Sequence, residues 1–236
     1  QVLFAHFRRA FGSINWATGG GGLHCGLAAH LGAGMNHCSW SILPDFKYCK
    51  YVIFFGTNKG VGAGHGAAMI AGLRAEAVSR GLKTVSFDPM CHQSGGKATE
   101  WVPILPGTDL AVCLAMANVL VNELKICDAE YLKNKTNAPY LVQTNGHYVR
   151  DDRGEPLMWD TTEQKAKAWD DPGAQDAALA LDGEYEVNGV RCHPAFELLK
   201  EHLKQYTPDW ASEISTVSAA TIRRIATEFS DNAQIG

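Results

Sequence analysis

Tyr51-Val-Ile-Phe-Phe55 is a short run of aromatic and β-branched residues, which is typical of a strand buried on both faces of a sheet. A helical pattern follows from Gly64 to Arg80, and a second strand pattern covers Lys83–Phe87. Asp88-Pro89 closes that second strand. Strand, helix and strand in this order predict a βαβ unit with a right-handed crossover.

The helix predicted between the two strands is amphipathic. Its apolar residues lie three to four positions apart and are expected to face the sheet: Ala67, Ile70, Leu73 and Ala77. Its charged residues are expected to face away from the sheet: Arg74, Glu76 and Arg80. Gly81 provides a C-terminal stop.

A third strand and another helix follow this unit. Trp101–Leu105 is predicted as a short strand, and Asp109 is expected to cap an apolar helix that runs to about Leu124. The order of elements predicts an α/β fold in which a Rossmann-like parallel sheet is flanked by helices.

After Tyr131 the sequence becomes polar and rich in turn residues. Turns are predicted at Asn145-Gly146, Arg153-Gly154 and Asp171-Pro172-Gly173, with short strands at 140–142 and 147–149. Two helices are predicted around 194–205 and 219–229. Because no strand follows the last helix, the sheet is expected to be incomplete and the chain to be a piece of a longer protein.

Composition narrows the classes of function. Of 236 residues, 46% are hydrophobic and 19% are charged, and no apolar run is long enough to predict a membrane span. A formal net charge of −4 argues against a nucleic-acid groove, which needs clustered Lys and Arg. The seven cysteines are scattered and form no CxxC pair, so they predict neither a zinc ribbon nor an iron–sulfur cluster.

The candidate ligand site lies at the carboxyl ends of the three predicted strands. It comprises Gly56, Thr57, Asn58 and Lys59 after the first strand, Asp88, Pro89 and Met90 after the second, and Gly107, Thr108 and Asp109 after the third. At this edge of an α/β sheet, helix N-termini bind phosphates, and carboxylates accept hydrogen bonds from ribose hydroxyls or a guanine amino group. Each loop alone is more often a turn, a strand end or a helix cap, but their joint placement predicts a nucleotide-bearing cofactor.

A second interpretation uses the stretch Gly62–Ala67, which satisfies the pattern GxGxxA with Asp88 at the end of the next strand. That pattern would indicate a nicotinamide or flavin dinucleotide. Its first glycine should follow the strand directly, whereas residues 56–61 intervene here.

Several motifs together carry a family resemblance. They are Phe11-Gly-Ser-Ile-Asn15, Cys25 after a glycine run, Gly56-Thr-Asn58, Asp88-Pro89, Trp101 with Pro106-Gly-Thr-Asp109, Tyr206-Thr-Pro-Asp-Trp210 and Ile222-Arg-Arg-Ile225. In this order they resemble the bis-molybdopterin-guanine-dinucleotide oxidoreductases of the dimethyl-sulfoxide-reductase family, closest to its thiosulfate and polysulfide reductase branch. The resemblance covers nearly the whole chain except about 140–192.

The resemblance implies a role for each loop. Gly56, Asn58 and their neighbours would bind the phosphates of the cofactor, Asp88 its ribose, and Asp109 with Gly107 its guanine. Cys25 would ligate molybdenum or tungsten, and a thiolate suits a soft metal already held by dithiolenes. His24, and likewise His30, could move protons beside Cys25, although a lone histidine is more often structural. Lys97 could approach a phosphate or remain solvated.

The resemblance also implies the setting of the chain. It would be part of a larger catalytic polypeptide that performs two-electron redox chemistry or oxygen-atom transfer, with a sulfur or arsenic oxyanion as the favoured substrate. Other domains of that polypeptide would complete the site, with an iron–sulfur cluster in the N-terminal part. The partner would be a separate iron–sulfur subunit for electron transfer. Either the periplasm or the cytoplasm fits. An NAD-dependent dehydrogenase and a non-catalytic nucleotide-binding module remain the alternatives.

Three portions of the chain are predicted. Residues 1–139 would form the molybdopterin-guanine-dinucleotide-binding α/β region with its metal-ligand loop. Residues 140–192 would be an irregular insertion, and 193–236 the helical start of a further α/β portion.

Overall fold

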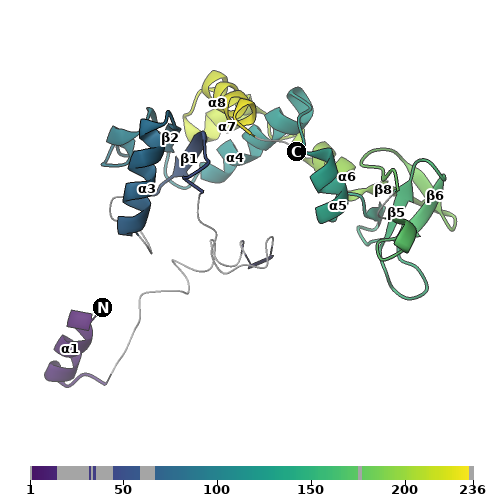
Figure 1. The fold of residues 1–236 in the computed structure, drawn as a ribbon, viewed down its shortest axis with the longest axis horizontal. Helices are drawn as coiled ribbons and strands as arrows, with labels where there is room; N and C mark the ends of the chain where they lie inside the picture. The colour runs from purple at the N-terminus through teal and green to yellow at the C-terminus, as the bar shows by residue number, and fades with distance from the viewer. Residues whose placement is uncertain are drawn as a thin grey trace. The chain divides into compact units, whose positions relative to one another are not determined.

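The computed structural model describes residues 2–14, 32, 34–35, 45–58, 67–174 and 177–233 (Figure 1). The chain divides into two compact units, Gln1–Asp45 and Phe46–Gly236. In the first unit, helix α1 spans Val2–Phe11, and Gly12 ends it with a positive φ of 81°.

The second unit is built on a parallel sheet of three strands. Strands β1 (Tyr51–Phe55), β2 (Lys83–Phe87) and β3 (Glu100–Val102) lie in the order β1-β2-β3, and both neighbouring pairs are parallel. The bounds of β1 and β2 are those predicted from the sequence. The predicted α/β class is also confirmed. The third is shorter than predicted, because Leu105 N donates to Ser215 O at 3.0 Å, outside the sheet.

Helix α3, Ala67–Ser79, connects β1 to β2, and its buried side is not the one predicted. Ile70 and Ala77 are buried as expected, but Leu73 is 37% exposed and Arg74 only 6%. The Arg74 guanidinium lies over the Phe54 ring, 5.0 Å from its centroid, and this contact brings a charged side chain into the predicted apolar face.

The helix after β3 begins as predicted but is capped differently. Helix α4 spans Asp109–Asn118 and continues as a π-helical turn, η2, over Val119–Glu123. The N-cap is Thr108, so the prediction that Asp109 caps the helix was wrong. Asp109 is the first helical residue, where a carboxylate is favoured by the helix dipole.

Helices cover both faces of the sheet. Alternate residues of β1 point to opposite sides, so Tyr51 packs in one core and Val52 in the other. The larger core lies beneath α4, α7 (Pro208–Ser215) and α8 (Ala219–Asp231), and the smaller one beneath α3. Helix α7 was not predicted, and neither were α5 (Ala129–Lys135) and the short 3-10 helix η1 (Gly95–Lys97).

Residues 140–192 are not irregular, contrary to the prediction. Strands β4 (Leu141–Gln143), β7 (Tyr185–Val187) and β8 (Val190–Pro194) form one antiparallel sheet, in the order β4-β8-β7. Strands β5 (Leu157–Asp160) and β6 (Lys165–Ala168) form a second antiparallel sheet. The short 3-10 helix η3 covers Pro172–Ala174. A shared core that includes Leu141, Leu157 and Cys192 stabilises them.

The connections within these sheets partly match the prediction. Gly146 and Gly154 have positive φ and confirm two of the predicted turns. The strand predicted at 147–149 is only an isolated bridge between Tyr148 and Val142. Helix α6 (Ala195–Leu203) follows β8 directly, within the first of the two predicted C-terminal helices.

No helix among the described residues is long and apolar enough to span a bilayer. The larger core includes Ala211 of α7 and Ile222 and Ile225 of α8 together with residues of β1 and β2, so these two helices cover the same sheet. The division of the chain at 139 and 192 stays a prediction.

Replacing Ile222 by alanine should destabilise this core. Ile222 is a fully buried residue of α8, and removing a buried isoleucine side chain costs roughly 2–5 kcal/mol because a cavity remains. Urea unfolding of Ile222→Ala should show this loss. Ile214→Ala on α7, where the side chain is 37% exposed, should lose clearly less, and equal losses would mean that the two positions are buried alike.

Candidate functional site

The loops after β1 and β2 lie side by side at one edge of the sheet. Gly56 N donates to Phe87 O at 2.9 Å, and Asp88 N donates to Val102 O at 3.2 Å, so the ladder continues into the loops. Gly56 has a φ of 53°, and a Cβ built there would meet nothing within 4 Å. The predicted meeting of Gly56 and Asp88 is confirmed, and open space borders the backbone where a ligand could approach.

The Asp88 carboxylate is held by its own loop. Its side chain is buried, with one oxygen accepting from Met90 N at 3.0 Å and the other lying 2.8 Å from His92 Nε2. The Trp101 indole donates to the Asp88 carbonyl at 2.9 Å. A carboxylate offers about four acceptor positions, so capacity remains for the hydroxyls of a ligand.

A second network fixes the amide of Asn58. Ser94 Oγ donates to Asn58 Oδ1 at 2.6 Å, and the Arg74 guanidinium donates to Ser94 Oγ and to Ser94 O, both at 3.4 Å. Burial lowers the pKa of Arg74, although a guanidinium remains charged at any ordinary pH. The Asn58 oxygen is therefore engaged by protein, and no hydrogen bond from its amide N–H groups to another described residue competes with donation to a ligand.

Sequence reasoning missed Arg74, Ser94 and His92. Their signal was weak, since Ser94 and His92 lie in a loop with no periodicity. Arg74 follows Ile70 by four positions and precedes Ala77 by three, which is the spacing of the buried face.

The third predicted loop follows β3, which is the strand next to β2 in the parallel sheet. Residues 103–106 separate Gly107 from the end of β3, and no hydrogen bond among the described residues joins Asp109 to the loops at Gly56 and Asp88. Gly107 has a φ of 81°, and Thr108 Oγ1 donates to Leu105 O at 2.6 Å in the tight turn before α4. Among the other predicted site residues, Thr57 is half-buried, whereas Pro89 and Met90 are exposed.

Four predicted residues lie outside the described part of the chain: His24, Cys25, His30 and Lys59. Residues 62–66 of the GxGxxA stretch are also outside it. Lys97 is described and is exposed on η1. Within the described ranges, no three His, Cys, Asp or Glu side chains are grouped so that they could hold a metal ion.

The edge is thus suited to a ligand rich in hydroxyls and phosphates. It offers an acceptor at Asp88, fixed amide donors at Asn58 and open backbone at Gly56. These are the groups that bind the sugar and phosphates of a nucleotide at the carboxyl end of a parallel sheet.

Known proteins resemble this chain over most of its length. A family model described as Molybdopterin oxidoreductase matches residues 1–220. A sulfite dehydrogenase polypeptide of Allochromatium vinosum is 32% identical, over 97% of this chain and 25% of its own. The alpha chain of perchlorate reductase from Dechloromonas aromatica is 30% identical, over 78% of this chain and 24% of its own.

A thiosulfate reductase and a solved structure agree with these matches. The molybdopterin-containing PhsA protein of thiosulfate reductase from Salmonella typhimurium is 32% identical over 56% of this chain and 16% of its own. Acetylene hydratase from Pelobacter acetylenicus shares the fold with a TM-score of 0.52 and 22% identity, over 85% of this chain and 19% of that one. The chain spans about a quarter of the length of the first two relatives. With a family model matched along residues 1–220, the chain belongs to the molybdopterin oxidoreductase family.

Proposed function

We propose that the sheet edge binds the nucleotide part of the molybdopterin cofactor, with molybdenum or tungsten, that membership of this family implies. The observation that carries the proposal is the juxtaposition of Gly56 and the Asp88 carboxylate at one edge of a parallel sheet. A guanine dinucleotide form, with two pterins per metal, fits three loops that each supply a different part of the nucleotide site.

Each loop has a proposed role. Gly56, Thr57, Asn58 and Lys59 bind phosphates through backbone and amide N–H groups. Asp88, with Pro89 and Met90 shaping its loop, accepts hydrogen bonds from ribose hydroxyls. Gly107, Thr108 and Asp109 receive the guanine, whose amino group donates to the Asp109 carboxylate. His92 and Ser94 are positioning residues, because they touch Asp88 and Asn58.

Cys25 is the proposed thiolate ligand of the metal, and His24 the proposed proton carrier beside it. Both lie outside the described residues, so the proposal rests on the motif order in the sequence. A molybdenum or tungsten centre of this kind supplies two-electron redox chemistry, often with oxygen-atom transfer.

The complete protein is proposed to be the catalytic subunit of such an oxidoreductase. Its favoured substrate is an oxyanion of sulfur or arsenic, and the similar proteins include a sulfite dehydrogenase and a thiosulfate reductase. Several similar proteins are named as one subunit of an enzyme, which supports further subunits, among which an electron-transfer iron–sulfur protein is the proposed partner. Further domains of the same polypeptide would complete the site and carry an iron–sulfur cluster.

Cofactor analysis of the purified complete enzyme tests this proposal. Acid hydrolysis should release a pterin and GMP, and elemental analysis should find molybdenum or tungsten. Release of NAD would support the dehydrogenase alternative instead. If neither a nucleotide nor either metal is found, the result would support the alternative of a non-catalytic nucleotide-binding module.

Substitution of Asp109 tests the guanine contact separately. In the complete enzyme, Asp109→Ala should lower the GMP content, since a buried guanine amino group left unpaired costs about 1–3 kcal/mol. The exposed Glu213→Ala on α7 is the control and should leave the GMP content unchanged. If Asp109→Ala retains as much GMP as the control, Asp109 does not bind guanine.

A further inference from the structure

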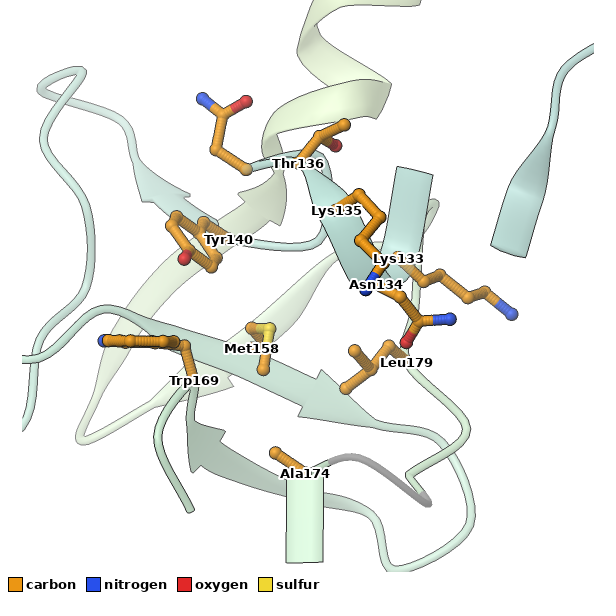
Figure 2. Close-up of a pocket in the computed structure, with 10 residues that line it drawn as sticks. Lys133, Asn134, Lys135, Thr136, Tyr140, Met158, Trp169, Ala174 and Leu179 are labelled. Carbon is orange, nitrogen blue, oxygen red and sulfur yellow. The ribbon is translucent and has the colours of Figure 1, made fainter. Parts of the chain in front are cut away.

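A cavity of about 440 Å³ lies beside the last turn of α5, where it is lined from α5, from β5 and from the segments that follow β6. It shares no residue with the loops at the sheet edge. Its volume is in the range of small-molecule pockets, roughly 300–1,000 Å³. Figure 2 shows Trp169 and Tyr140 on one side, Lys133 and Lys135 on the other, and Met158 between them.

The floor of this pocket is apolar. Met158, Leu179 and Ala174 are each no more than 5% exposed and pack in one cluster, with Tyr140 against it. Such a floor favours an apolar ligand body, because it removes apolar surface from water without offering hydrogen bonds.

Two aromatic rings with fixed orientations form one wall. The Trp169 indole is anchored by a hydrogen bond from Nε1 to Glu155 Oε2 at 2.5 Å, yet the residue is 52% exposed. The Tyr140 ring packs edge-on against Tyr148, with centroids 5.5 Å apart. Rings held in this way can stack against a flat ligand with little loss of side-chain entropy.

The opposite wall carries positive charge. Lys133 and Lys135 form no ion pair with any carboxylate in the ranges that the structure describes, whereas Lys165 and Lys167 on β6 are both paired with acids. The net charge of the whole chain is −4, so two ammonium groups that no described carboxylate neutralises attract an anion to this pocket against the overall charge.

We propose that this pocket binds a small organic anion made of a carboxylate on a flat aromatic body. The ring lies against Trp169 and over Met158, and the carboxylate faces Lys133 and Lys135. The Asn134 amide nitrogen donates one N–H to Glu130 Oε2 at 3.4 Å, and its other N–H is a further donor. This site is additional to the cofactor site proposed at the sheet edge and does not depend on it.

Calorimetry on the purified complete enzyme tests the proposal with two matched probes, 2-naphthoate and the neutral 2-naphthalenemethanol. The naphthoate should bind one-to-one and at least about fivefold more tightly than the alcohol, since two partly exposed ion pairs add a modest attraction for its carboxylate. The double substitution Lys133→Gln/Lys135→Gln should remove this preference and leave binding of the alcohol unchanged. Lys204→Gln, at an exposed lysine on the C-terminal cap of α6, should change neither affinity.

Substitution of the aromatic wall completes the test. Trp169→Leu should weaken both probes by about tenfold, and Trp169→Phe, which keeps a ring for packing, by less. Naphthoate affinity that is unchanged in the double lysine variant or in Trp169→Leu would overturn the site. Absence of naphthoate binding to the unsubstituted enzyme would overturn it too.

Discussion

Cys25→Ala in the complete enzyme is expected to remove one sulfur from the coordination shell of the metal and to abolish most turnover. A thiolate is a strong ligand for a soft metal, and even indirect partners of metal ligands cost about 10–100-fold when removed, so a loss of roughly a hundredfold or more is expected. X-ray absorption counts the sulfurs around the metal, and a steady-state assay measures the turnover.

Cys113→Ala is the matched control for that experiment. Cys113 is a free cysteine on α4, and its substitution should alter packing only slightly and leave the sulfur count as it was. If Cys25→Ala has an unchanged sulfur count and retains turnover, Cys25 is not a ligand of the metal but an ordinary thiol in a loop. The 236-residue chain by itself is expected to bind no metal, since one thiolate and part of a cofactor site cannot hold it.

The strands of the parallel sheet were predictable because burial on both faces makes their composition distinctive. Tyr51–Phe55 is apolar at every position, and its alternate side chains enter two different cores. The end of the third strand could not be predicted from a run of apolar residues. Ile104 is buried in the same core as Tyr51, yet the chain has already left the sheet after Val102. Burial alone does not distinguish a strand from a buried loop.

Residues 140–192 were hard to read for a different reason. Strand β4 pairs with β8, which lies about fifty residues later in the sequence. Which residues of this region form short strands is therefore determined by non-local pairing rather than by a local sequence pattern. The short helices α5 and α7 do carry local signals in their caps. Asp128 accepts a hydrogen bond from Tyr131 N, and Thr207 accepts one from Trp210 N ahead of a first-turn proline.

The candidate site shows the same contrast between the residues proposed to face a ligand and the residues that hold them. Gly56, Asn58 and Asp88 could be named because they follow strands, and strand ends are where α/β sheets bind ligands. Their supports, Arg74 and Ser94, are recognised only once the fold brings a helix residue and a loop residue together. A charged residue on an apolar helix face is then a sign of a buried network rather than a break in the pattern.

Asp88→Ala in the complete enzyme is expected to reduce the bound cofactor severely. The substitution removes the proposed acceptor of ribose hydrogen bonds, and hydrogen bonds to a charged group contribute about 1.5–3 kcal/mol each, so the affinity should fall at least about tenfold. It also removes the oxygens that hold Met90 N and His92 in the loop. The measurement is the pterin and GMP content per protein after gel filtration, which separates released cofactor.

Two variants distinguish the loss of a ligand contact from the loss of loop structure. His92→Ala removes the histidine partner of the carboxylate, together with the acceptor of the 3.4 Å hydrogen bond from Ser94 N, and leaves both Asp88 oxygens available, so most cofactor should remain bound. Asp152→Ala removes an exposed carboxylate in a turn of the 140–192 region and should have no effect. If Asp88→Ala binds as much cofactor as Asp152→Ala, the Asp88 carboxylate does not contact the nucleotide. If His92→Ala loses as much cofactor as Asp88→Ala, the loop conformation rather than the carboxylate determines binding, because the histidine has no proposed contact with the ribose.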